Sequence, residues 1–154
     1  MATVLSRMIE LCVFRREPEG VRYLLLHRSP NEPIYPDIWQ FVTGSIEGDE
    51  RATDAALREL AEETGLTPRG FWVVPYVVSF YDPSWDTLNL SPLFAAEVDA
   101  VAEPRLSGEH SEFGWYPYAA ASPKLAWPSQ QEGLRTVNDL IVNGVGVSRL
   151  TRII

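Results

Sequence analysis

Residues 51–64 constrain the fold most, because they predict one well-bounded amphipathic helix. Gly65 suits the left-handed residue that ends a helix, and Pro68 prevents the helix from continuing. The apolar residues of the segment recur at close to the 3.6-residue period of an α-helix: Ala52, Ala55, Ala56, Leu57 and Leu60.

Strand-like segments precede this helix. Residues 4–15 and 21–28 are rich in Val, Leu and Tyr, and the turn-like cluster between them predicts a hairpin. A loop with three prolines follows, because no helix or central strand accommodates Pro30, Pro33 and Pro36 so close together. A short strand is then expected from Trp39 to Thr43.

The second half of the chain also predicts alternating structure. Strands are expected at 71–80, at 92–99 and near 112–116, and the polar segment 81–91 predicts a loop. Residues 129–142 predict a second helix with Ser129 as its N-cap. With no repeat or linker, residues 1–154 predict one mixed α/β domain.

Composition narrows the classes of protein. The 154 residues are 45% hydrophobic, enough for a real core, and the net charge of −8 argues against binding a nucleic-acid polymer. No apolar run approaches the ~20 residues of a membrane span, and no signal peptide is expected. Cys12 is the only cysteine and lies in an apolar run, so we expect a small core residue in a cytoplasmic protein.

One feature of the helix is electrostatically unusual. Glu59, Glu62 and Glu63 stand at i, i+3 and i+4, so three like charges share one face. A solvated acidic face is the ordinary explanation, since glutamate is a good helix former. Against it, Arg58 and Glu50 are spaced so that an ion pair across the helix start could hold the carboxylates. Hard oxygen ligands in such an arrangement suit Mg²⁺ or Mn²⁺, with substrate phosphates completing the site.

These residues resemble the Nudix box at all nine of its defining positions. Glycine immediately before the first glutamate is common in relatives, whereas this chain has Asp49 there. The matching positions are Gly44, Glu50, Arg58, Glu59, Leu60, Glu62, Glu63, Gly65 and Leu66. The resemblance implies a Nudix α/β/α sandwich with a mixed β-sheet, and a hydrolase acting on phosphoanhydride bonds.

The resemblance also implies roles for residues of the box. Glu59, Glu62 and Glu63 would bind divalent cations, aided by a backbone carbonyl near Gly44. Arg58 and Glu50 would orient that site. Cations held there would neutralise phosphate charge and lower the pKa of a bound water for in-line attack.

Two segments outside the box resemble bacterial dihydroneopterin triphosphate pyrophosphatases, also described as dATP pyrophosphohydrolases. The run from Trp39 to Ser45 is similar to their WQxVTGS segment, and Glu109-His110 followed by Trp115 is similar to a later one. This second similarity implies that Glu109 is a further metal ligand or the general base. An exposed loop carboxylate is the alternative.

Candidate substrate contacts each have an ordinary alternative. Arg28 would contact phosphate or form a salt bridge at a strand end, and His110 would contact phosphate or be structural. Gln40 would bind a heterocycle edge or satisfy a neighbouring strand. Trp39 and Trp85 would stack on a base or pterin, whereas Trp72 and Trp115 are expected in the core.

The sequence therefore predicts a Mg²⁺-dependent pyrophosphohydrolase, with Mn²⁺ as a substitute. It would convert a small-molecule nucleoside or pterin triphosphate to the monophosphate plus pyrophosphate, as a monomer or homodimer. A dinucleoside polyphosphate or nucleotide-sugar hydrolase is the first alternative, and a non-catalytic nucleotide-binding module is the second. The intact acidic set disfavours the second, because a binding module need not retain it.

Overall fold

Strand β2 (Met8–Glu17) divides the core into two halves, because its side chains alternate between the two faces of a sheet. The computed structural model describes residues 1–154. Ile9 and Leu11 pack in one cluster with Leu60 of helix α1 (Ala52–Thr64). Cys12 and Phe14 belong to a second cluster that contains residues of the C-terminal helices. Cys12 is fully buried, as predicted.

An eight-stranded mixed sheet lies between the two clusters. Strand β7 is parallel to β1 and β2, and the other strand pairs are antiparallel. The order along the sheet is β1-β7-β2-β3-β4, with β5 on β2, β6 on β7 and β8 on β3. The strands not yet given are β1 (Thr3–Leu5), β3 (Gly20–Arg28), β4 (Trp39–Gln40), β5 (Val42–Ser45), β6 (Gly70–Asp82), β7 (Thr87–Glu97) and β8 (His110–Tyr116).

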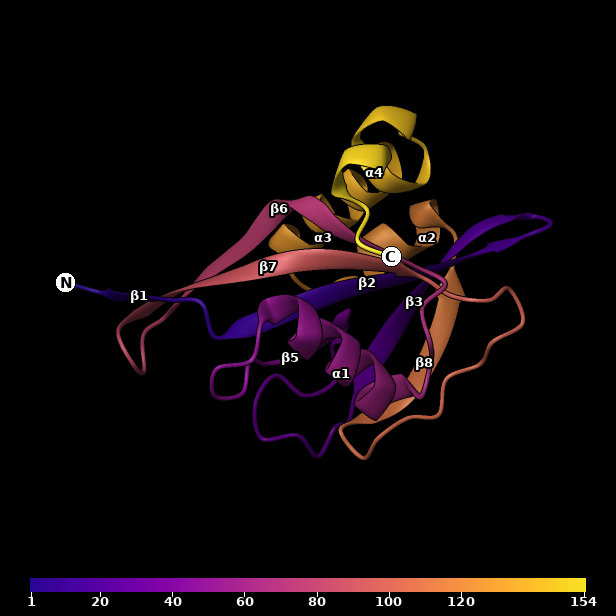
Figure 1. Ribbon diagram of the computed structural model, residues 1–154. Helices are drawn as coiled ribbons and strands as arrows, with labels where there is room; N and C mark the ends of the chain where they lie inside the picture. The colour runs from indigo at the N-terminus through magenta and orange to yellow at the C-terminus, as the bar shows by residue number, and fades with distance from the viewer.

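Helices cover both faces of the sheet (Figure 1). Helix α1 lies on one face, and the C-terminal helices lie on the other. These are α2 (Tyr118–Lys124), α3 (Pro128–Thr136), the π-helical turn η1 (Val137–Val142) and α4 (Val145–Thr151). The predicted α/β/α sandwich with a mixed sheet is confirmed.

Local sequence signals correctly predicted the main elements in the first half of the chain. The hairpin of β2 and β3 forms as predicted, and α1 spans nearly all of the predicted helix. Gly65 ends α1 with a φ of 69°, and its N–H donates to the Ala61 carbonyl at 2.9 Å. Glycine adopts this left-handed backbone without steric cost.

Three predicted elements differ from the structure. The loop expected at 81–91 is mostly strand, because β6 and β7 continue pairing to a turn at 83–86. The strand expected from Trp39 to Thr43 is split at Phe41, because β4 pairs with β3 and β5 pairs with β2. Helix α3 begins at Pro128, which is favoured in a first turn, so Ser129 lies inside the helix and is not its cap.

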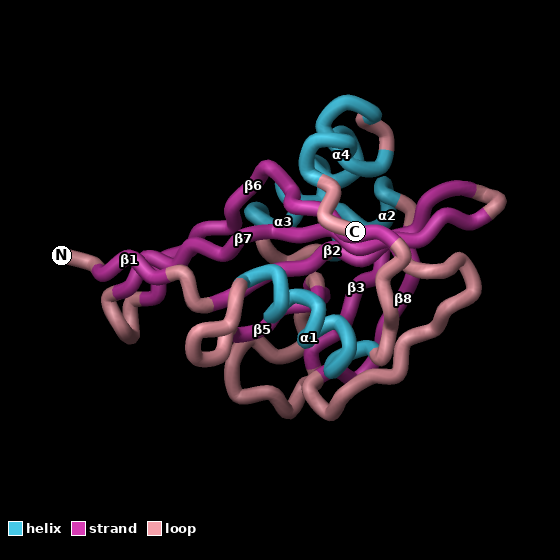
Figure 2. Tube along the Cα trace, in the orientation of Figure 1, coloured by secondary structure: helices cyan, strands magenta, loops and turns pink.

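Two long loops lie on the α1 side of the sheet (Figure 2). They are residues 29–38, before β4, and residues 98–109, before β8. Their ends are tied together, since the Ser29 N–H donates to the Glu109 carbonyl at 3.2 Å. No helix is both long and apolar enough to cross a membrane.

Candidate active site

Arg58 on α1 organises the acidic face of that helix. Its Nε donates to Glu50 Oε1 at 2.9 Å, and its Nη2 donates to Glu50 Oε2 at 3.0 Å. Its Nη1 donates to Glu59 at 2.9 Å and to Glu62 at 3.1 Å. The predicted pairing of Arg58 with Glu50 is therefore confirmed, and one guanidinium holds three carboxylates of the Nudix-box pattern.

The ionisation of these groups reflects the network. Hydrogen bonds from Arg58 lower the pKa of the Glu50 carboxyl, and the same contact raises the pKa of the Arg58 guanidinium. Burial raises the pKa of Glu59, although Arg58 opposes that shift. Arg58 therefore stays charged, and its contacts hold the acidic side chains in position.

Gly44 on β5 allows the sheet to approach α1 closely. A Cβ atom built at Gly44 would overlap the side-chain carboxylate of Glu59. The Glu59 side chain is only 13% exposed. The glycine therefore determines where this carboxylate lies, in addition to any contribution from its backbone carbonyl.

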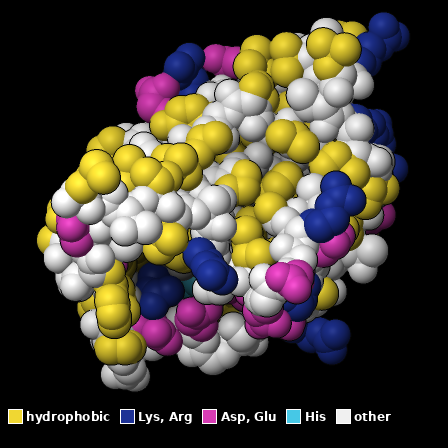
Figure 3. Space-filling model, turned by 60° about the vertical axis from the view of Figure 1, so that its left-hand side comes forward, with side chains coloured by type: hydrophobic (Ala, Val, Ile, Leu, Met, Phe, Trp, Pro, Cys, Tyr) yellow, Lys and Arg dark blue, Asp and Glu magenta, His cyan; other side chains and the backbone are white.

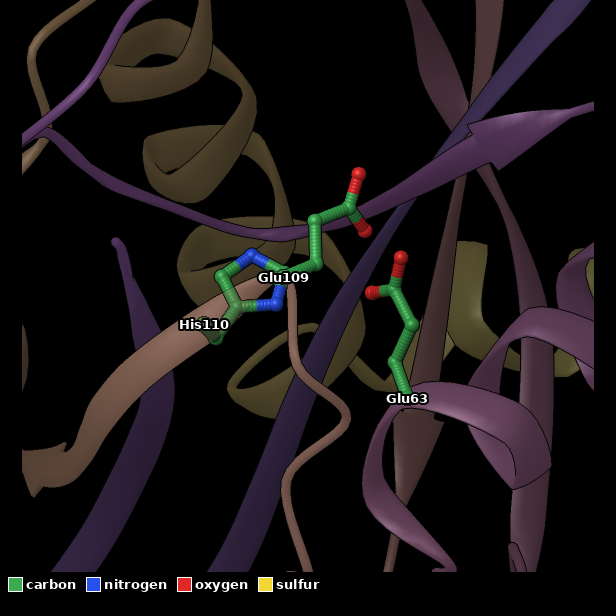
Figure 4. Close-up of side chains that lie close together, drawn as sticks. All are labelled: Glu63, Glu109 and His110. Carbon is green, nitrogen blue, oxygen red and sulfur yellow. The ribbon is translucent and has the colours of Figure 1, made fainter. Parts of the chain in front are cut away.

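Glu63 faces the loop before β8 (Figure 4). One ligand atom each from Glu63, Glu109 and His110 lies within 4.8 Å of the other two. Glu63 is 4% exposed, and its Oε2 is buried without a hydrogen-bond partner. Burial, reinforced by the neighbouring charge of Glu109, raises the pKa of Glu63 to about 9. We name Glu63, Glu109 and His110 the loop cluster.

The loop cluster fits a divalent cation. Two carboxylates pointing at one another are unfavourable unless a proton or a cation lies between them, and the orphaned Glu63 oxygen needs a partner. Carboxylate oxygens suit Mg²⁺ and Mn²⁺. Burial lowers the pKa of His110, so its imidazole is neutral, and its Nδ1 is also buried without a partner. Glu59 and Glu62 would extend this site along α1.

A cavity of about 740 Å³ opens beside the loop cluster. Figure 3 shows hydrophobic side chains gathered around a hollow on this face, with acidic side chains along its lower edge. The aromatic and aliphatic residues that line it include Ile34, Tyr35, Phe80, Tyr81, Trp85 and Trp127. A cavity of this size and lining suits a planar organic group.

Two side chains belong to both the cavity and the surroundings of the loop cluster. Arg28 lines the cavity, and its Nη1 lies 3.6 Å from Glu109 Oε1. Gln40 also lines it, and its Nε2 lies 3.1 Å from His110 Nε2. Arg28 forms a second ion pair with Glu32 at 3.2 Å. Arg28 therefore forms salt bridges at the end of its strand, and it also lies in the cavity where it could contact a phosphate.

The two tryptophans that were predicted to stack on a ligand, Trp39 and Trp85, lie in different surroundings. Trp85 lines the cavity and is 80% exposed, so it is free to stack on a ligand. Trp39 is not among the residues that line this cavity. Successive strand residues point to opposite sides, and Trp39 packs against His27 and Tyr116, at ring-centroid distances of 4.9 and 5.9 Å.

Sequence reasoning missed several cavity residues. Glu10 of β2, Gln130 of α3 and Trp127 line the cavity without having been singled out. Glu10 offered a signal, since it is a charged residue between Ile9 and Leu11 in a buried strand. Trp127 offered only its position before the proline that starts α3.

Comparison with known protein families matches residues 7–137 to the NUDIX domain. The matched range contains the whole acidic face of α1, the loop cluster and all the residues that line the cavity. The chain belongs to the Nudix hydrolase family. The Nudix-box pattern expected from the sequence therefore lies in a genuine Nudix domain.

Curated relatives share parts of this Nudix chain. An octanoyltransferase of Myxococcus xanthus is 30% identical over 136 residues, which are 84% of this chain and 36% of the relative. A dihydroneopterin triphosphate diphosphatase of Escherichia coli (strain K12) is 40% identical over 63 residues, which are 41% of this chain and 39% of the relative. The matches thus span just over a third of the length of these relatives.

A solved structure reproduces the fold. The binary complex of a C. elegans Ap4A hydrolase superposes with a TM-score of 0.77 at 18% identity, covering 90% of this chain and 99% of that one. At this identity the similarity describes the Nudix fold alone, and it does not identify a substrate.

Divalent cations are expected to raise the melting temperature of this protein. At a hundred times its Kd, a cation bound only to the folded state stabilises it by about 2.7 kcal/mol. The rise should be larger at pH 8 than at pH 6, because the pKa of Glu63 is raised to about 9 and a bound cation must displace its proton. Thermal unfolding with and without Mg²⁺ or Mn²⁺ measures both effects.

Glu109→Ala should reduce the cation-induced rise, because it removes one carboxylate of the loop cluster. Glu112→Ala is the matched control, since Glu112 is an exposed acid of β8 outside the cluster. Equal rises in both variants would remove Glu109 from the cation site.

Proposed function

We propose that this Nudix protein is a divalent-cation-dependent pyrophosphohydrolase. Its substrate would be a nucleoside or pterin triphosphate, which it converts to the monophosphate plus pyrophosphate. Mg²⁺ is the expected cation and Mn²⁺ a substitute. The observation that carries this proposal is the position of the loop cluster beside the cavity, with Arg28 and Gln40 reaching both.

In this proposal, different side chains of the site have different roles. The carboxylates Glu59, Glu62, Glu63 and Glu109 would hold the cation. When bound, it would neutralise phosphate charge, polarise phosphorus and acidify a water for attack. Arg58 would keep Glu50, Glu59 and Glu62 in place, and a carboxylate of the set would accept a proton from that water.

The cavity would hold the part of the substrate that does not react. Arg28 is the cationic side chain nearest to Glu109 in that cavity, so it would contact the phosphate chain as it leaves the cation site. Trp85 and Trp127 would then flank the planar group. A phosphate chain bound in this way would extend from the loop cluster into the cavity.

The similarity to the E. coli dihydroneopterin triphosphate diphosphatase favours a triphosphate over the rival substrates. The 40% identity covers only 63 residues, so the whole activity of that relative is not transferred. The rival substrates are a dinucleoside polyphosphate and a nucleotide sugar, each of which carries a second organic group beyond the phosphate chain.

A substrate panel tests the proposal. Dihydroneopterin triphosphate, dATP, dGTP, diadenosine tetraphosphate and ADP-ribose would be incubated with Mg²⁺, and pyrophosphate and monophosphate would be quantified. We expect pyrophosphate release from at least one of the three triphosphates, and much slower turnover of diadenosine tetraphosphate and ADP-ribose than of that triphosphate. If no compound is turned over by folded, cation-loaded protein, the hydrolase proposal is wrong and a binding module remains.

A further inference from the structure

Two buried polar side chains lie in the cavity and have no part in the Nudix box. Glu10 comes from β2 and is 9% exposed, and Gln130 comes from α3 and is 1% exposed. Gln130 Nε2 donates to Glu10 Oε2 at 3.2 Å. We name Glu10 and Gln130 the floor pair. They line the cavity where the sheet meets α3.

Burying the two polar side chains of the floor pair costs the folded state free energy. Glu10 stands between the core residues Ile9 and Leu11, where an apolar side chain would pack without penalty. Burial raises the pKa of Glu10 to about 7, and Gln130 provides its side-chain hydrogen bond. Gln130 Oε1 is buried without any partner. The pair therefore keeps unmet hydrogen-bonding capacity in the wall of the cavity.

The floor pair leaves two acceptor oxygens free, beside the second N–H of the Gln130 amide. The Gln130 amide uses an N–H on Glu10, so its carbonyl oxygen remains. When it is ionised, the Glu10 carboxylate has a second acceptor oxygen beyond the one that Gln130 contacts. Two neighbouring acceptors are satisfied together by a ligand that presents two neighbouring donors.

The walls of the cavity define the shape of that ligand. Tyr35 and Trp127 meet edge to face, with ring centroids 5.0 Å apart, and Phe80 and Trp85 also line the space. Aromatic side chains of this kind stack on flat heterocycles. The ligand edge that reaches the floor pair is therefore the edge of a planar ring.

We propose that Glu10 and Gln130 are specificity-determining residues that recognise a heterocycle carrying an amino group beside a ring N–H. Guanine and 2-amino-4-oxopteridines have this edge. Adenine has an amino group beside an unprotonated ring nitrogen, which would place a lone pair against the floor pair. This assignment rests on the proposed function, because the cavity is taken as the site of the non-reacting group.

The kinetic test compares dGTP, dITP and dATP. Inosine lacks the amino group but keeps the ring N–H, so dITP isolates one of the two donors. We expect kcat/KM to fall from dGTP to dITP to dATP, with roughly 100-fold or more between the first and last, because buried acceptors left unpaired discriminate strongly. Equal values for dGTP and dATP would overturn the assignment.

Glu10→Gln tests the residue itself. Glutamine has nearly the same size and offers both a donor and an acceptor, which suits adenine as well. The dGTP-to-dATP ratio should fall at least about tenfold, and cation-induced stabilisation should be unchanged. Glu132→Gln is the matched control, because it removes an exposed carboxylate of α3 outside the cavity. An unchanged ratio in Glu10→Gln would contradict the proposal.

A binding measurement separates this proposal from the hydrolase activity. GMP, IMP and AMP would be titrated into the wild-type protein, with quenching of tryptophan fluorescence as the signal. Tighter binding of GMP that is lost in Glu10→Gln supports the floor pair even if no triphosphate is hydrolysed. Equal affinities overturn the floor pair even if hydrolysis is efficient. The wild-type comparison needs no variant to fold.

Discussion

Replacing Glu62 with glutamine is expected to lower triphosphate turnover by about 10²- to 10⁴-fold, the range that one positioned acid–base group contributes. Glu62 is 59% exposed, and its ion pair is with Arg58 at 3.1 Å. Glutamine keeps the size and still accepts a hydrogen bond, so the melting temperature should hardly change. The change removes the negative charge that Glu62 offers to a cation and to Arg58. Steady-state kinetics and thermal unfolding measure the two effects.

Glu47→Gln is the control for this prediction. Glu47 also approaches Arg58, at 3.6 Å, and is 72% exposed, but it is not a defining position of the box. Its replacement should leave turnover close to wild type. Unchanged turnover in Glu62→Gln would remove Glu62 from the cation site. An equal loss in both variants would assign the effect to the charge balance around Arg58.

Gly44→Ala is expected to reduce both cation affinity and activity. The added methyl group would overlap the Glu59 carboxylate, so either Glu59 or strand β5 must move. Displacing a group that orients a metal site typically costs 10- to 100-fold in affinity or activity, so a loss of about that size is expected. Overpacking should also reduce the free energy of unfolding by about 1–3 kcal/mol.

The control for this variant is Gly146→Ala on α4. A Cβ atom at Gly146 meets nothing within 4 Å, so the substitution should leave cation affinity unchanged. Because Gly146 lies in a helix, alanine should leave the free energy of unfolding unchanged or raise it by up to about 1 kcal/mol. Isothermal titration with Mn²⁺ gives the affinity, and urea unfolding gives the stability. Wild-type cation binding by Gly44→Ala would show that the contact with Glu59 has no bearing on the site.

Much of the fold follows from local sequence signals. Helix α1 has a regular apolar period and a glycine that ends it, and the β2–β3 hairpin has two apolar strands around a turn. Each signal lies within a short stretch of chain, so no knowledge of distant partners is needed.

The errors arise where distant pairing overrides local composition. Residues 81–91 look like a loop because they are polar, yet β7 is held by β1 on one side and β6 on the other. The split at Phe41 has the same origin, because β4 and β5 pair with different strands. Propensity is a weak predictor in such places.

The site shows the same contrast. The acidic face could be predicted because Arg58, Glu59 and Glu62 lie on one helix, where spacing fixes geometry. The floor pair could not, because Glu10 and Gln130 are 120 residues apart and meet only after folding. The position of Trp39 outside the cavity could not be predicted either, because alternation along a strand does not reveal which side faces a cavity.

The two faces of the sheet have an evolutionary consequence. The box side chains of α1 pack on one face, whereas Gln130 and Trp127 belong to the α3 region on the other. Substitutions at sites that share no partners tend to act independently. Substitutions around α3 could therefore change which substrate is selected during evolution, while the Nudix-box residues that would act in bond cleavage stayed the same. Arg28 and Gln40 line the cavity and contact Glu109 and His110, so changes at these two positions would affect both the cavity and the loop cluster.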